Sequence, residues 1–301
     1  MKKDYFFGLS EEGFHRVAYL EWGNPNSSIP IICVHGLTRN GHDFDNLAAY
    51  LSNLGYHLFC PDIVGRGDSD WLKNPLHYTY EQYISDMNAL IARTGAHQVD
   101  WIGTSMGGLI GMVLAAQPNS PIRRLILNDI GAQVATSGLT RISMYAGKEP
   151  DFNSLEEAKN YFKKIFADMG PLTDEEWMRI AQNSVREVEK NKFVTKLDHG
   201  VKLAPAKSKI AWQTLLHPLK ALEGTLFDVD LWPVWRKVNC PVLIIHGQKS
   251  DILLPETIKK MQEIHPDTEV IEIPAAGHAP ALMHADQHEM IYQWLQKQIK
   301  R

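Results

Sequence analysis

Ser105 occupies the centre of the pentapeptide Gly103 to Gly107, directly after the apolar run Val99 to Ile102. A strand that turns sharply into a helix strains its central residue, so the residues two positions before and after it must be very small. Such a turn exposes a serine hydroxyl at the carboxyl end of a sheet and places the next backbone N–H at a helix N-terminus. Ser105 is therefore the candidate nucleophile.

A serine hydroxyl is a weak nucleophile at neutral pH and needs a base within hydrogen-bond reach. Of the 13 histidines, His278 follows the strand-like run Val270 to Ile273, in a loop of small residues that can aim an imidazole at the serine. We expect His278 to be the base. His35, which follows another apolar run, is interpreted as a structural hydrogen-bonding residue.

The imidazole in turn needs a carboxylate that holds its tautomer and stabilises the imidazolium. Two aspartates are candidates, because each follows an apolar run that would end at the same edge of a sheet. Asp251 comes after Val242 to Ile245, and Asp129 comes after Leu125 to Leu127. The residues alone leave both possibilities open.

These side chains require a scaffold of alternating strands and helices. Short apolar runs predict strands buried on both faces: Ile29 to Val34, Tyr56 to Cys60, Val99 to Ile102, Leu125 to Leu127, Val242 to Ile245 and Val270 to Ile273. Amphipathic patterns between them predict helices: Phe44 to Asn53, Tyr80 to Thr94, Gly107 to Gln117, Glu256 to Ile264 and Asp286 to Ile299. This order predicts an α/β fold with a mostly parallel sheet flanked by helices. His15 to Trp22 alternates more loosely and is expected to form an antiparallel edge strand.

The alternation of predicted strands and helices is interrupted between residues 132 and 237. Ser154 to Met169 and Thr173 to Lys190 show helical periodicity, but no convincing apolar strand is visible there. We therefore expect a helical cap at 132–237, inserted into a core formed by 1–131 and 238–301. Its tryptophans could line the roof of a pocket, although each is expected to pack the core of the cap: Trp177, Trp212, Trp232 and Trp235.

Over nearly its full length the chain resembles the α/β-hydrolase family, in particular members that carry a cap. The residues that carry the resemblance are His35-Gly36, Asp62 with Gly65 to Ser69, the turn at Ser105, Gly247 to Asp251, and Gly277-His278. In this family the nucleophile, the acid and the histidine follow in that order, and the acid usually follows the penultimate strand. The resemblance thus implies a triad of Ser105, Asp251 and His278, with Asp129 as the rival acid because some members use that position.

The resemblance also implies an oxyanion hole formed by the backbone N–H groups of Leu37 and Met106. A serine at the turn argues against haloalkane dehalogenases and epoxide hydrolases, which use aspartate there. The segment His35 to Gly41 lacks the consecutive glycines of HGGG lipases. Asp62 and Arg66 to Ser69 are expected to brace their loop rather than to perform chemistry.

We therefore predict a carboxylesterase that cleaves small or medium acyl esters through an acyl-enzyme and needs no cofactor. A carbon–carbon bond hydrolase or an acyltransferase could use the same triad, although Ala279 stands where carbon–carbon hydrolases tend to carry a bulky tryptophan. A third possibility is a non-catalytic member of the fold that binds a ligand under its cap.

The composition of the chain limits the kinds of ligand and binding partner that we expect. With 44% hydrophobic and 22% charged residues the chain can bury a substantial core. A net charge of -4, with acids and bases interspersed, predicts no binding to nucleic acid or to a membrane and favours a small-molecule ester substrate. No metal-ligand spacing is present. Three cysteines without a CxxC pair, and no secretory signal core, predict a cytoplasmic protein; the oligomeric state stays open.

Overall fold

The computed structural model describes residues 1–26, 29–201 and 229–297. At its centre lies an 8-stranded sheet in the order β1-β2-β4-β3-β5-β6-β12-β13. β1 and β2 are antiparallel, as are β2 and β4, and the other neighbours are parallel. The predicted mostly parallel sheet is confirmed. The strands are β1 Lys2–Ser10, β2 Gly13–Gly23, β3 Ile31–Val34, β4 His57–Pro61, β5 Val99–Thr104, β6 Ile122–Asn128, β12 Val242–Gly247 and β13 Glu269–Ile273.

The central strands are buried on both faces because successive side chains point to opposite sides of the sheet. In β3, Ile32 and Val34 belong to one apolar cluster, whereas Ile31 and Cys33 belong to the other. β12 divides its side chains between the same two clusters. This two-sided burial accounts for the continuous apolar runs in the sequence.

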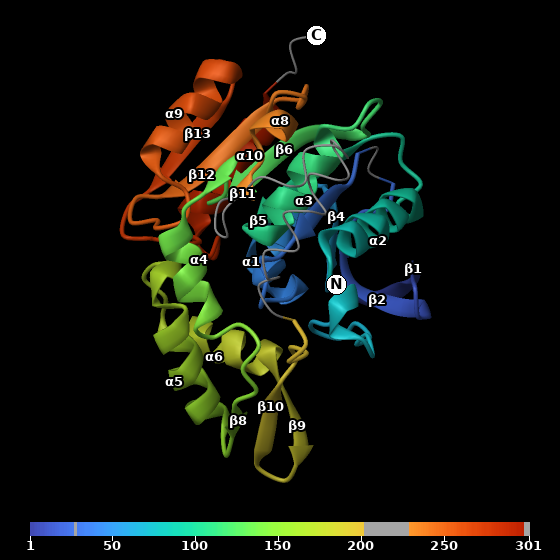
Figure 1. The fold of residues 1–301 in the computed structure, drawn as a ribbon, viewed down its shortest axis with the longest axis vertical. Coiled ribbons are helices and arrows are strands. Elements are labelled where there is room, and N and C mark those ends of the chain that lie inside the picture. The colour runs from blue at the N-terminus through green and yellow to red at the C-terminus, as the bar shows by residue number, and fades with distance from the viewer. Residues whose placement is uncertain (27–28, 202–228, 298–301) are drawn as a thin grey trace.

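Helices cover both faces of the sheet (Figure 1). Buried side chains of α2, α3 and α9 join one cluster, and those of α1 and α10 join the other. The bounds are α1 Asp45–Asn53, α2 Tyr80–Arg93, α3 Met106–Ala115, α9 Pro255–Ile264 and α10 Ala285–Gln296, with short 3-10 turns at Gly41–Phe44 and Pro75–His77. No helix in the described part of the chain is long and apolar enough to cross a membrane.

The predicted edge strand lies inside the sheet. β2, at Gly13–Gly23, contains the predicted run but pairs with β1 on one side and β4 on the other. At this end of the sheet the edge strand is β1, which includes the apolar run Tyr5 to Leu9. The exposed residues of this run are apolar, so the alternation of buried and exposed positions within it is not visible in the sequence.

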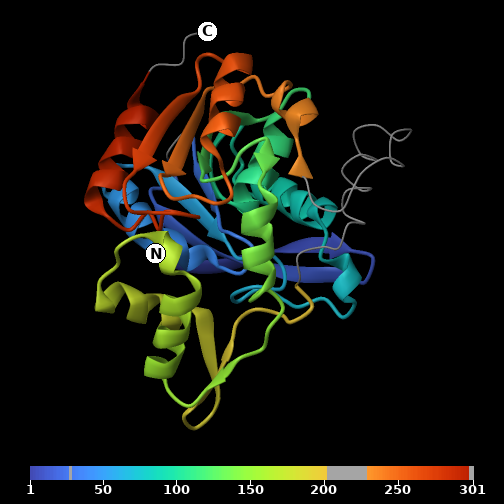
Figure 2. The same cartoon turned by 60° about the vertical axis from the view of Figure 1, so that its left-hand side comes forward.

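The segment between β6 and β12 adds no described strand to the central sheet. Two of its helices, α5 Leu155–Ile165 and α6 Asp174–Ser184, lie below the sheet in Figure 2 and have an apolar cluster of their own, with the 3-10 turn Ala167–Met169 between them. The first helix, α4 Thr136–Ser143, instead packs Ile142 into the main core. A 3-stranded sheet in the order β8-β10-β9 completes this region, with β8 at Asp151–Phe152, β9 at Val185–Glu189 and β10 at Lys192–Thr195.

Two details of this region differ from the sequence expectation. The helix expected at 173–190 ends at Ser184, because Val185 starts a β-hairpin that turns at Asn191, whose φ is 61°. Trp177 packs in the cluster of the segment's own helices, but Trp232 and Trp235 are buried in the main core. Trp212 lies outside the described residues.

The ends of the inserted segment return to the central core. The short strands β7 Gln133–Val134 and β11 Val229–Asp230 pair with each other, and α8 Trp232–Trp235 follows directly. The limits 132–237 therefore remain a proposal for where a cap begins and ends.

Candidate active site

Ser105 lies between β5 and α3 with φ 50° and ψ -113°, a strained backbone conformation for a residue with a side chain. A Cβ added to Gly103 would lie 2.4 Å from the backbone of Gly107, and one added to Gly107 would lie 2.0 Å from the carbonyl oxygen of Val34. Both glycines are therefore required by the close approach of the turn to its neighbours. The strand, turn and helix predicted around Ser105 are confirmed.

His278 connects this serine to a carboxylate. Its Nε2 lies 2.8 Å from Oγ of Ser105, and its Nδ1 lies 2.9 Å from Oδ2 of Asp129. Because a carboxylate only accepts hydrogen bonds, Nδ1 carries the proton and Nε2 is free to accept from the hydroxyl. The three side chains thus form one line of hydrogen bonds from a buried acid to the strained turn.

Asp129 is held firmly at the carboxyl end of β6. Its side chain is fully buried, and its carboxylate accepts hydrogen bonds from the backbone N–H of Gly247 at 2.8 Å and from the hydroxyl of Ser250 at 2.5 Å. Its own N–H donates to the carbonyl of Ile245. These donors, in addition to His278, satisfy an acid that would otherwise be costly to bury.

The expectation that Asp251 holds the histidine is corrected by this geometry. The carboxylate of Asp251 accepts two hydrogen bonds from the Arg141 guanidinium, at 2.8 and 2.7 Å, and Asp168 lies 3.2 Å from the same guanidinium. These hydrogen bonds, together with the positive charge of Arg141, hold the pKa of Asp251 below its usual value. Arg141 belongs to α4 in the inserted segment, so its pairing depends on how that segment folds back, which the sequence does not show.

The backbone groups proposed for the oxyanion hole flank the serine. Met106 is the first residue of α3, where a helical N–H has no intrahelical acceptor. Leu37 follows Gly36, at which an added Cβ would lie 3.8 Å from Cβ of Ser105. Met106 therefore directly follows the nucleophile, and Leu37 follows a residue that lies against it.

Arg66 is a residue whose contact with this site sequence reasoning missed. Its side chain is fully buried; Nε donates to the carbonyl of Leu37 at 2.9 Å, and Nη2 lies 3.7 Å from Sδ of Met106. The guanidinium also donates to the hydroxyl of Tyr83 and lies over its ring, 4.7 Å from the centroid. Arg66 thus contacts both residues of the proposed oxyanion hole. The signal available in the sequence was an arginine between two glycines.

The loop that carries Arg66 is braced as expected. Asp62 accepts hydrogen bonds from the backbone N–H groups of Gly41 and Asp68, both at 2.7 Å, and the hydroxyl of Ser69 donates to the Asp62 carbonyl. A Cβ added to Gly67 would lie 2.1 Å from the Asp62 carboxylate. The close packing of this loop explains the small residues in its sequence.

His35 has the structural role predicted for it. It is completely buried, its Nδ1 donates to the carbonyl of Gly36 at 2.7 Å, and its Nε2 accepts from the N–H of Ile63 at 3.0 Å. Burial lowers its pKa to about 3, so the imidazole stays neutral. Both ring nitrogens are occupied by backbone, which leaves none for a substrate.

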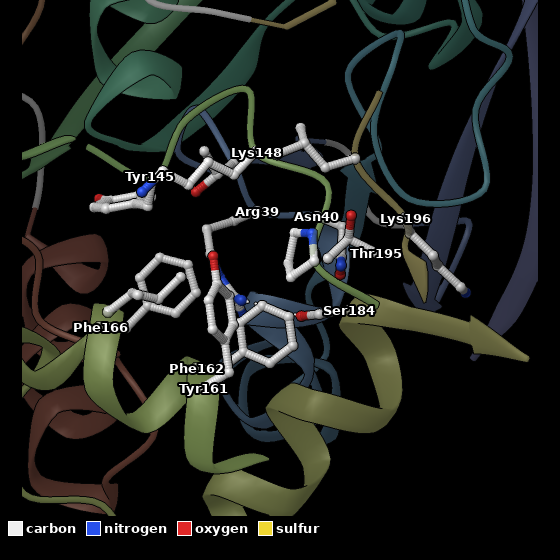
Figure 3. Close-up of a pocket in the computed structure, with 14 residues that line it drawn as sticks. Arg39, Asn40, Tyr145, Lys148, Tyr161, Phe162, Phe166, Ser184, Thr195 and Lys196 are labelled. Carbon is white, nitrogen blue, oxygen red and sulfur yellow. Dashed lines mark hydrogen bonds between the residues drawn. The ribbon is translucent and has the colours of Figure 1, made fainter. Parts of the chain in front are cut away.

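A small pocket, partly open to solvent, adjoins the oxyanion loop (Figure 3). Residues 38–40 form one wall, and aromatic side chains of the inserted segment form another, including Tyr145, Phe162 and Phe166. Arg39 lies 4.8 Å from the centroid of Phe166 and donates to the hydroxyl of Ser184 at 3.1 Å. Ser105 and His278 are not among the residues that line the pocket. Among the described residues, no group of three or more histidine, cysteine or acidic side chains could hold a metal ion.

Comparison with known proteins identifies the class. The model of the alpha/beta hydrolase fold matches residues 29–285, and the chain belongs to this family. It is 39% identical over 275 residues to a 3-hydroxybutyrate-oligomer hydrolase of Cupriavidus necator, covering 91% of each chain, and 25% identical to Lipase 1 of Psychrobacter immobilis, covering 90% of this chain and 78% of the lipase.

A solved structure of an alpha/beta hydrolase from Novosphingobium aromaticivorans aligns with a TM-score of 0.81 and 31% identity, covering 98% of this chain and 97% of the other. The family and its relatives establish that the protein is an enzyme, a hydrolase. The fold predicted by resemblance is thereby confirmed.

Proposed function

We propose that the protein is a serine esterase whose triad consists of Ser105, His278 and Asp129. The observation that carries this proposal is the unbroken line of hydrogen bonds from Asp129 through His278 to the strained serine. Ester hydrolysis requires a hydroxyl whose proton can be removed as it attacks, and this arrangement provides the base beside the hydroxyl.

In the first half-reaction, Oγ of Ser105 attacks the ester carbonyl carbon while its proton moves to Nε2 of His278. The buried carboxylate of Asp129 stabilises the imidazolium that forms. The N–H groups of Leu37 and Met106 donate to the oxygen that becomes negatively charged. When the tetrahedral intermediate collapses, the bond to the alkoxide breaks and His278 gives its proton to this leaving group. The alcohol departs, and Ser105 remains acylated at Oγ.

In the second half-reaction, a water molecule attacks the acyl carbonyl and His278 takes its proton. Collapse of this intermediate breaks the bond to Oγ, and His278 returns the proton to Ser105. The products are a carboxylic acid and an alcohol. The mechanism assigns no step to a cofactor or metal.

For the substrate, we propose short oligomers of 3-hydroxybutyrate and similar aliphatic esters. The relative that is 39% identical over 91% of both chains is described as a hydrolase of 3-hydroxybutyrate oligomers, and this likeness supports the proposal. The aromatic wall of the pocket beside residues 38–40 also suits an aliphatic chain.

The test is to incubate purified protein with 3-hydroxybutyrate dimer and trimer, p-nitrophenyl esters of graded chain length and a ring-fission dienoate. We expect monomeric 3-hydroxybutyrate and p-nitrophenol to be released, and Ser105→Ala to release neither while unfolding at a similar temperature. Turnover of the dienoate alone would instead support a carbon–carbon hydrolase. A preference for transfer to an added alcohol over water would support an acyltransferase, and binding without turnover a non-catalytic member of the fold.

We further propose a cytoplasmic location. The cysteines are free thiols, with Cys33 and Cys60 buried, which is compatible with a reducing compartment. Cell fractionation followed by immunodetection tests this proposal, and recovery of the protein outside the cytoplasmic fraction would contradict it.

A further inference from the structure

Strand β1 carries an apolar stripe on the surface of the molecule. Tyr5, Phe7 and Leu9 are 47%, 59% and 59% exposed, while Phe6 and Gly8 between them are buried. Phe14, which faces Leu9 from β2, is 76% exposed and extends the stripe. The rings of Tyr5 and Phe7 are in edge contact at 5.5 Å, and those of Phe7 and Phe14 at 6.2 Å. A contiguous apolar surface of this kind is typical of an interaction site.

The backbone of this strand is also open to a further partner. β1 is at one end of the sheet, at the side opposite β13. Phe7 lies opposite Arg16 of β2, but the N–H and the carbonyl of Arg16 both bond to Asp70, on the side away from β1. Because antiparallel pairs alternate between bonded and non-bonded residues, the N–H and carbonyl of Phe7 point out of the sheet.

The neighbouring odd-numbered residues follow the same rule. Tyr5 lies opposite Ala18, whose backbone bonds to residues 62 and 69. At present the outward N–H of Tyr5 donates to its neighbour Asp4, and the outward carbonyl of Leu9 accepts from Gln82. Both hydrogen bonds are made with exposed side chains, so backbone groups of a partner strand can replace them.

We propose that β1 pairs antiparallel with β1 of a second copy of this chain, around a two-fold axis at Phe7. In this register the outward-facing groups of Phe7 bond to the partner's Phe7, and those of Tyr5 bond to the partner's Leu9. The exposed aromatic side chains of both copies then form one apolar surface across the dimer interface. An isologous contact of this kind closes on itself and yields a dimer with a continuous sheet.

Charge complementarity selects this register. Lys3 comes opposite the partner's Glu11, which directly follows β1 in the turn to β2, and their side chains are 55% and 87% exposed. Within one copy these side chains pair with Asp68 and His77 at the surface, and the partner's opposite charge would compete for them. A shift by two residues in one direction places Lys3 opposite the partner's Leu9, and in the other direction it places Glu11 opposite the partner's Tyr5. The register centred on Phe7 therefore pairs opposite charges at both ends and apolar side chains between them, the arrangement that stabilises cross-strand pairs.

Sedimentation equilibrium over a range of protein concentrations tests this dimer. We expect the wild type to be dimeric, and Phe7→Lys, which places two like charges at the axis, to raise the dissociation constant at least about tenfold. Phe7→Pro should do the same, because it removes an outward N–H while no hydrogen bond to β2 depends on it. Met144→Lys, at an apolar residue of the inserted segment that is 61% exposed, is the matched control and should leave the dimer unchanged.

Charge exchange tests the register itself. Lys3→Glu and Glu11→Lys should each weaken the dimer, and the double variant should restore it. Circular dichroism of each variant shows whether the fold is kept, so that loss of folding is not mistaken for loss of pairing. A wild type that is monomeric at every concentration, a dimer that folded Phe7 variants retain unchanged, or assemblies larger than a dimer would overturn the proposal.

Discussion

Oδ2 of Asp129 lies 2.9 Å from Nδ1 of His278, whereas Asp251 directs its carboxylate to Arg141. Two aspartates at the same edge of the sheet thus have different partners. Asp129 is fully buried against the backbone, and the Asp251 side chain is 34% exposed. The first holds the imidazole, and the second joins the core to α4.

Asp129→Asn is expected to reduce kcat for ester hydrolysis by about 10⁴-fold, because an amide no longer fixes the tautomer or stabilises the imidazolium. The measurement is steady-state hydrolysis of a p-nitrophenyl ester. Asp251→Asn is the matched control, since it makes the same chemical change to a carboxylate bonded to Arg141, and we expect a loss of less than about tenfold, in line with a partly exposed ion pair. The reverse ranking would return the acid role to Asp251.

Arg66→Met is expected to lower kcat by about 10- to 100-fold with a smaller change in KM, because Arg66 holds the residues that would bind the oxyanion. Arg66→Lys keeps the charge but loses the forked geometry, and it should restore only part of the rate.

The readout for Arg66 is the inhibition constant of a phosphonate that mimics the tetrahedral intermediate, compared with KM of the ester. A purely structural role would weaken both to the same degree, or would lower the fraction of folded enzyme alone. Arg16→Met, at a surface arginine paired with Asp70, is the control and should change neither value.

Phe166→Leu is expected to change the ratio of short-chain to long-chain ester turnover by about two- to tenfold, because this side chain forms part of the pocket wall beside residues 38–40. Phe152→Leu is the matched control, since Phe152 belongs to the same apolar cluster but does not line the pocket. Equal ratios in the two folded variants would place the substrate chain elsewhere.

The free energy of unfolding is expected to fall as the pH decreases from about 6.5 toward 3, in part because of His35. The unfolded histidine takes up a proton near pH 6.5, whereas burial lowers its pKa in the folded state to about 3. Within this window the unfolded state binds the additional proton, so stability falls with decreasing pH by up to about 1.4 kcal/mol per pH unit.

Urea denaturation of the wild type and His35→Gln at several pH values measures this effect. The comparison is needed because burial raises the pKa of Asp62 to about 6, and this shift makes the folded state more stable as the pH falls from about 6 toward 4. The variant should show a shallower loss of stability in acid. Parallel curves for the two proteins would contradict the assignment to His35.

Much of the molecule was predictable from sequence because local rules determine it. Strands buried on both faces need continuous apolar runs, and the turn at Ser105 tolerates only glycine at the two positions that meet neighbouring backbone. The histidine in the loop after the last strand could likewise be predicted to reach the serine, and Nε2 of His278 lies 2.8 Å from Oγ of Ser105.

Tertiary structure decided which acid meets that histidine. Asp129 and Asp251 both follow parallel strands, so sequence order places both at the same edge, and only the position of Arg141 on the folded segment shows that Asp251 is engaged elsewhere. Similarly, Arg66 stands among glycines in the sequence, but its contacts with Leu37 and Met106 join loops that are far apart in the chain. Contacts of this kind depend on the three-dimensional packing of distant segments, which local sequence patterns do not encode.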